Sequence, residues 1–87
     1  MTIQEKFDLT GRAAIVTGGA GLLGAEFCRT LAEAGAGVIV ADLNAGMAEK
    51  TAHALTESGL RAVGYGLDIT SPESCRGAVD LALSAFG

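Results

Sequence analysis

A glycine-rich stretch holds the residues of this chain whose types and spacing are typical of anion binding. Gly19, Gly21 and Gly24 follow the spacing G-x-G-x-x-G, directly after an apolar run and directly before a helical pattern. Because glycine has no Cβ atom, such a turn adopts positive φ and its backbone N–H groups approach an anion closely. The helix that follows adds roughly half a positive charge at its N-terminus. The stretch therefore predicts a turn that cradles a phosphate or a diphosphate.

A carboxylate follows where a dinucleotide-binding turn requires one. Asp42 stands 18 residues after Gly24, at the end of the second apolar run, Val38–Asp42. In dinucleotide-binding folds an acidic residue at about this distance accepts hydrogen bonds from ribose hydroxyls. The structural alternatives are a tight turn without a ligand and an Asp42 that only caps the next helix. Asn44 is itself a suitable cap for that helix.

Apolar and amphipathic segments alternate along the chain and predict the elements that position these residues. Strands are expected at about 12–17, 38–42 and 61–67, and helices at about 22–34, 44–58 and 72–86. The first two strands show no alternation, which is typical of strands buried on both faces of a parallel sheet. Apolar residues at helical spacing are expected to face the core. They are Leu23, Phe27 and Leu31 in the first helix, Met47, Ala48, Ala52 and Leu55 in the second, and Cys75, Val79, Ala82, Leu83 and Phe86 in the third.

The order β-α-β-α-β-α predicts an α/β fold, a Rossmann-type doubly wound parallel sheet with strand order 3-2-1. On this interpretation residues 1–87 form one incomplete domain without a second domain, because such a sheet continues with further strands beside the first. The first strand is then an exposed apolar edge. Phe7 and Leu9 are expected to anchor the segment that leads into it.

Composition and charge narrow the classes of function. The net charge is −4, and the 6 basic residues are scattered, which argues against partners such as nucleic acid or an anionic membrane. We find no signal peptide and no apolar run long enough to span a bilayer. Cys28 and Cys75 lack metal-type spacing, so we predict no metal site and a cytoplasmic location. His53 is expected on the wet face of the second helix and Tyr65 inside the third strand, neither in a catalytic role.

Three motifs in order resemble the N-terminal half of the short-chain dehydrogenases/reductases. They are the segment 15–24, Ala41-Asp42-Leu43 and Leu67-Asp68-Ile69-Thr70, and the resemblance extends from about residue 7 to residue 87. It implies a set of residues that line the diphosphate and the nearby ribose: Gly18, Gly19, Ala20, Gly21, Leu22 and Leu23. It also implies that Asp42, with Leu43 beside it, binds the adenosine ribose, and that Asp68 and Ile69 flank the adenine.

The chain departs from the family pattern at one position. The classical form, T-G-x-x-x-G-x-G, has glycine where this chain has Leu22, and the glycine here is Gly21. That placement is similar to extended members of the family, many of which act on sugar nucleotides. The motif around Asp68 looks classical, so we favour the classical type and keep an extended-type epimerase or dehydratase as an alternative.

Asp42 predicts NAD as the cofactor. A carboxylate 4 Å from the 2′-phosphate of NADP would be repelled by roughly 4 kcal/mol at an effective dielectric constant near 20. Neither Leu43 nor Asn44, which follow, carries a compensating positive charge. The resemblance implies an oxidoreductase that exchanges hydride between nicotinamide and a carbonyl or alcohol, in a homo-oligomeric parent protein.

The residues that carry out proton transfer in the family are not found in this sequence. The resemblance implies a Ser–Tyr–Lys group downstream, so no catalytic residue is assigned here and the chain alone is expected to be inactive. Tyr65 is followed four residues later by Ile69, where the family has lysine. A non-catalytic dinucleotide-binding module is the alternative from a different functional class.

Overall fold

The computed structural model describes residues 9–87, which form three parallel strands and three helices. Phe7, one of the two predicted anchors, lies outside the described residues. The elements, in order, are β1 (Ala13–Thr17), α2 (Leu22–Glu33), β2 (Gly37–Asp42), α3 (Ala45–Glu57), β3 (Ala62–Gly66) and α4 (Pro72–Phe86). The sequence predicted all six, with bounds that differ by about one residue.

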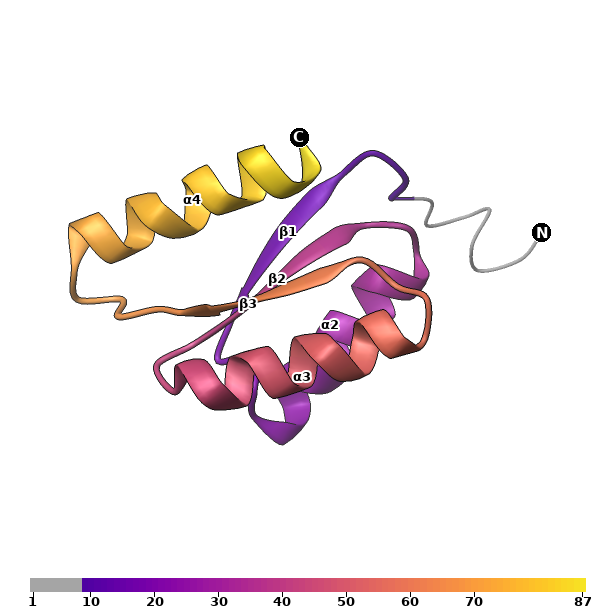
Figure 1. The fold of residues 1–87 in the computed structure, drawn as a ribbon, viewed down its shortest axis with the longest axis horizontal. Helices are drawn as coiled ribbons and strands as arrows, with labels where there is room; N and C mark the ends of the chain where they lie inside the picture. The colour runs from indigo at the N-terminus through magenta and orange to yellow at the C-terminus, as the bar shows by residue number, and fades with distance from the viewer. Residues whose placement is uncertain (1–8) are drawn as a thin grey trace.

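The sheet has the order β1-β2-β3, and both strand pairs are parallel, with Ile39 of β2 between Ile15 and Val63. Helices α2 and α3 cover one face of the sheet and α4 covers the other (Figure 1). The central strand is therefore enclosed on both faces, and its residues Val38–Ala41 are fully buried. The predicted α/β class and the strand order 3-2-1 are confirmed.

Local signals fix the helix ends, and Asn44 is the cap that the sequence indicated. The Asn44 side chain caps α3 by accepting a hydrogen bond from the Met47 N–H, 3.0 Å away. Ser71 caps α4 ahead of Pro72. Gly35 follows α2 with φ 107° and Gly59 follows α3 with φ 84°, a conformation that glycine adopts without strain.

The predicted core stripes of the helices are partly wrong, because small side chains face the sheet. Cys28 and Ala32 are the buried residues of α2, and Ala78 and Ala82 are those of α4. Small side chains let each helix lie close to a sheet whose own valine and isoleucine side chains fill the interface. Helical periodicity marks the apolar side of a helix without specifying which part of that side faces the sheet. In α3 the stripe is correct except for Met47, which is exposed.

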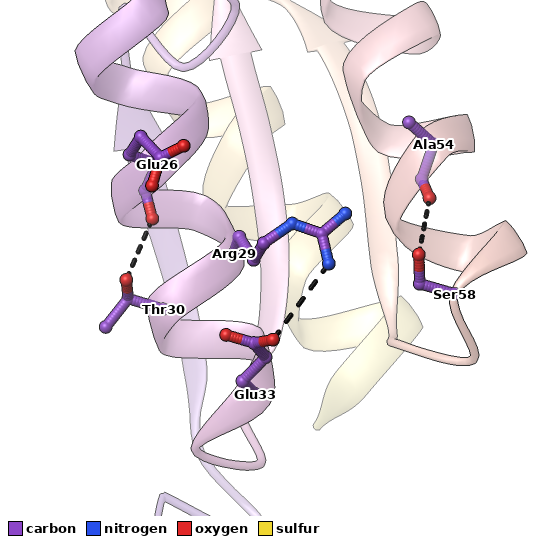
Figure 2. Close-up of polar contacts among 6 residues, drawn as sticks. All are labelled: Glu26, Arg29, Thr30, Glu33, Ala54 and Ser58. Atoms are coloured by element: carbon purple, nitrogen blue, oxygen red, sulfur yellow. Dashed lines mark hydrogen bonds and ion pairs between the residues drawn. The ribbon is translucent and has the colours of Figure 1, made fainter.

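Two larger apolar residues of α2, Leu23 and Phe27, lie on the flank of the helix that faces away from α3, whereas Leu31 packs against the core as predicted. Figure 2 shows Arg29 projecting from α2 on the side toward α3, where it pairs with Glu33 at 4.0 Å. Phe27 stands two residues from Arg29 and so lies about 200° around the helix from it. Leu23, one turn before Phe27, lies on the same flank, and the two are 69% and 57% exposed.

Helix α4 repeats this arrangement on the other face of the sheet. Its Ser74 carbonyl accepts a hydrogen bond from the Tyr65 hydroxyl of β3 at 2.9 Å, which fixes the flank that faces β3. Val79 and Leu83 lie away from that flank, toward β1, and both are exposed. We use the name β1-edge surface for the exposed apolar residues of β1 and of these two helix flanks: Ile15, Leu23, Phe27, Val79 and Leu83. The sequence predicted an exposed apolar edge at the first strand, but it placed the four helix residues of this surface in the core.

None of the helices in residues 9–87 has the length and apolar character needed to cross a membrane. The second predicted anchor, Leu9, packs against the core on the α2 and α3 face. Its backbone N–H also donates to the Ala34 carbonyl at 2.8 Å, which ties the start of the described chain to the end of α2.

Candidate functional site

A cleft of about 470 Å³ lies at the carboxyl ends of the three strands. In open parallel sheets ligands bind at this end of the strands. The cleft is lined by Thr17, Gly18, Ala41, Asp42, Leu43, Leu67, Asp68, Ile69 and Thr70. Five of the ten predicted cofactor-binding residues are among them. The other five, Gly19, Ala20, Gly21, Leu22 and Leu23, follow Gly18 in the loop and in the first turn of α2.

At three positions of the loop and the first turn of α2, the structure requires glycine. Gly18 adopts φ 68°, the left-handed region. A Cβ atom on Gly19 would stand 2.9 Å from Val40 Cγ1, and one on Gly24 would overlap the carbonyl group of Gly18. Gly21 has φ −72° and its Cβ would find only ordinary contacts, so the backbone does not require glycine there. Gly24 therefore packs directly against the backbone of Gly18 and Gly19.

The loop amides are largely satisfied within the protein. Three consecutive N–H groups donate to protein acceptors: Gly19 to the Ala41 carbonyl at 2.9 Å, Ala20 to Asp42 Oδ2 at 3.3 Å, and Gly21 to the Gly18 carbonyl at 3.1 Å. These bonds fix the shape of the loop. An added anion would have to compete with them for the same donors.

The first turn of α2 offers donors without such partners. The first intrahelical bond runs from the Ala25 N–H to the Gly21 carbonyl at 2.8 Å, and Gly21 provides no side-chain cap. The amides of Leu22, Leu23 and Gly24 therefore lack a helical acceptor. An anion at this helix end would gain both these donors and the helix dipole.

The Asp42 carboxylate points back toward the glycine loop. Besides the Ala20 amide bonded to Oδ2, its Oδ1 accepts from the Asn44 N–H at 3.0 Å. Asp42 does not cap α3, because Asn44 does. The carboxylate lines the cleft and lies between the loop and the start of α3. A carboxylate has about four acceptor positions, so two remain for ligand hydroxyls.

The far wall of the cleft is formed by the segment after β3. Asp68 Oδ1 accepts from the Thr70 hydroxyl at 2.6 Å and from the Thr70 N–H at 2.9 Å, and these bonds lower the pKa of the Asp68 carboxyl below its usual value. Leu43 and Ile69 line the same cleft with side chains that are 78% and 72% exposed. Thr70 was missed as a site residue, although the spacing Asp-x-Thr is a signal for this turn.

The other residues singled out in the sequence do not line the cleft. Cys28 is buried beneath the loop, and this burial raises the pKa of its thiol. Cys75 is half-buried. His53 is exposed and its Nε2 lies 2.6 Å from Glu57 Oε1. Tyr65 is held by its bond to the Ser74 carbonyl. Within residues 9–87, no cluster of three His, Cys, Asp or Glu side chains could hold a metal ion.

A parallel sheet with a glycine loop and a carboxylate at its strand ends defines a dinucleotide-binding type of α/β protein. Residues 12–87 match the short chain dehydrogenase family. The chain therefore belongs to this family, and the resemblance inferred from its motifs is confirmed.

Individual relatives agree with this assignment. The chain is 37% identical over 84 residues to the 7alpha-hydroxysteroid dehydrogenase of Escherichia coli strain K12, which covers 97% of this chain and 33% of that protein. It is 39% identical over 79 residues to a 2,5-dichloro-2,5-cyclohexadiene-1,4-diol dehydrogenase of Sphingobium indicum, covering 91% of this chain and 32% of that protein. The chain thus spans about one third of the length of these relatives.

Solved structures show the same fold. A 7α-hydroxysteroid dehydrogenase complexed with NADH and 7-oxo glycochenodeoxycholic acid superposes with a TM-score of 0.89 at 34% identity, over 100% of this chain and 34% of that one. A short chain dehydrogenase/reductase from Burkholderia phymatum in complex with NAD gives a TM-score of 0.85 at 28% identity, over 93% of this chain and 29% of that one.

Proposed function

We propose that these residues bind NAD(H) as the cofactor-binding portion of an oxidoreductase that transfers hydride between nicotinamide and a carbonyl or alcohol. One observation carries the proposal: the Asp42 carboxylate lies between the glycine loop and the cleft at the strand ends. Two similar proteins hold NADH or NAD in their structures, which supports the same cofactor here.

The residues present fit the parts of this cofactor. The diphosphate would accept from the amides of Leu22 and Leu23 at the uncapped end of α2, beside Gly18. The adenosine ribose would donate its hydroxyls to Asp42. The adenine would lie between the exposed apolar side chains of Leu43 and Ile69, next to Asp68. When bound, the nicotinamide supplies or takes the hydride, and the residues of this chain bind and orient the cofactor.

The same carboxylate is the reason to propose NAD over NADP. The 2′-phosphate of NADP would meet Asp42, and Leu43 and Asn44, the next two residues, offer no positive charge. The repulsion is roughly 4 kcal/mol at 4 Å for an effective dielectric constant near 20, and this value is the upper limit of the expected preference for NAD over NADP.

We propose that proton transfer is performed by residues outside this sequence. Tyr65 is bonded to α4 and does not line the cleft, so it is not available as an acid or base there. The chain alone is therefore expected to bind cofactor without turning over substrate. A cytoplasmic location and a homo-oligomeric parent protein belong to the same proposal, and an extended-type enzyme or a non-catalytic module stays an untested alternative.

Calorimetric titration of the 87-residue chain with NAD and with NADP tests the proposal. We expect NAD to bind roughly tenfold more tightly or better, because only NADP places a phosphate against the carboxylate. Asp42→Asn should remove this preference. Glu49→Gln, which neutralises an exposed carboxylate of α3 outside the cleft, should keep it. Equal or tighter binding of NADP by the unchanged chain would refute the cofactor assignment.

A further inference from the structure

One side chain connects the glycine loop to the second strand. The Ala20 N–H donates to Asp42 Oδ2 at 3.3 Å, across 22 residues of sequence. The other oxygen of this carboxylate accepts from the Asn44 N–H at 3.0 Å. Asp42 is thereby fixed at two points, and one of them is the loop itself.

The bond to Ala20 differs in kind from the other bonds that hold the loop. Gly19 and Gly21 donate to the carbonyls of Ala41 and Gly18, which every residue type at those positions would supply. Only the Ala20 amide depends on a side chain. Residue 42 is thus the position at which a substitution removes one loop bond and leaves the other two unchanged.

We propose that Asp42 is a positioning residue for the glycine loop, in addition to its proposed contact with the ribose. By accepting from the Ala20 amide, the carboxylate occupies that donor and leaves the amides of Leu22 and Leu23 to receive the diphosphate. The inference rests on the proposed cofactor site. Both roles are compatible, because two of the four acceptor positions of the carboxylate are used by Ala20 and Asn44.

The positioning role and simple charge repulsion predict opposite changes in diphosphate binding when Asp42 is replaced. Asp42 is an anion near the place of another anion, so simple repulsion predicts that removing its charge strengthens diphosphate binding. Loss of loop positioning predicts weaker binding, because the diphosphate would then also have to order the loop. The two explanations of residue 42 are therefore distinguishable with a ligand that has no ribose.

Backbone amide NMR of the 87-residue chain provides the test, with inorganic diphosphate as the probe. We expect Asp42→Ala to speed hydrogen exchange at the Ala20 amide roughly tenfold, the loss of one charge-assisted bond. Diphosphate binding, read from the amide shifts of Leu22 and Leu23, should weaken by about threefold or more. Asp42→Asn retains one acceptor oxygen without the charge, so it should lie between Asp42→Ala and the unchanged chain.

A second carboxylate in the cleft serves as the matched control. Asp68→Ala removes the same charge from the cleft, but Asp68 bonds Thr70 and has no bond to the loop. It should leave exchange at the Ala20 amide unchanged. Unaltered Ala20 exchange in Asp42→Ala, or tighter diphosphate binding by that variant, would overturn the positioning role. If Ala20 exchange responds while diphosphate fails to shift Leu22 and Leu23 in the unchanged chain, the positioning bond stands and the proposed cofactor site fails.

Discussion

Replacing Gly24 with alanine should disturb both the stability of the fold and the shape of its loop. Gly24 lies in the first turn of α2, directly against the backbone of Gly18 and Gly19. A Cβ atom there would overlap the Gly18 carbonyl oxygen and stand 2.9 Å from Gly19 Cα. The opposing atoms belong to the backbone, so no side-chain rotation relieves the contact.

The magnitude follows from two opposing effects. Inserting a methyl group into a packed site costs up to about 3 kcal/mol, and a backbone neighbour places this site at the upper end. Alanine is better than glycine within a helix by about 1 kcal/mol. The net loss in the free energy of unfolding is therefore about 2 kcal/mol, which lowers the melting temperature of a domain of this size by roughly 8–16 °C.

Gly46→Ala is the matched control, because Gly46 lies in the first turn of α3 with only Asn44 Oδ1 near its Cβ position, at 3.5 Å. It should be neutral or slightly stabilising. Urea unfolding followed by circular dichroism measures both variants. Equal stability of Gly24→Ala and Gly46→Ala would refute the claim that the loop packs against α2 as closely as the structure shows.

Two further predictions concern the titrating groups. Thr70→Val should raise the pKa of Asp68 toward its ordinary value, as measured by NMR titration, since the hydroxyl bond at 2.6 Å is lost. The stabilisation from this bond is present above the ordinary carboxyl pKa and is lost as the pH falls through the lowered one, so the variant should lose less stability in acid than the unchanged chain. An unmoved pKa would contradict the assignment. Burial raises the pKa of the Cys28 thiol, so iodoacetamide should modify half-buried Cys75 roughly tenfold faster than Cys28, as followed by mass spectrometry. The contribution of Cys28 to stability should be present below the thiol pKa of the unfolded chain and disappear as the pH rises through the thiol pKa of the folded one. Equal modification rates would show that Cys28 is accessible.

Signals carried by neighbouring residues were sufficient to predict the order and the ends of the elements. Asn44, Gly35 and Gly59 act within one turn of the chain, so their effect does not depend on distant packing. The orientation of the helices could be predicted only in part, because Leu31 of α2 and Ala82 of α4 face the core as expected while other residues of the same stripes do not. Leu23 and Phe27 follow the helical period, yet small residues on the adjoining face of α2 approach the sheet.

The candidate site was also predicted only in part from the sequence. The glycine spacing located the loop, but only the backbone geometry shows that Gly18 and Gly19 require glycine while Gly21 does not. The bond from Ala20 to Asp42 joins a backbone donor to a side chain 22 residues away. Every residue except proline has a backbone N–H, so the amino-acid sequence of the loop does not indicate the contact.

The β1-edge surface affects how this chain behaves in solution. Its five apolar side chains border a strand whose outer N–H and C=O groups face no further strand within residues 9–87. An exposed strand edge of this kind can pair with a second chain, so folding and self-association of the isolated chain become linked equilibria. Its apparent melting temperature should then rise with protein concentration, and thermodynamic constants for the monomer have to be obtained by extrapolation to dilute solution.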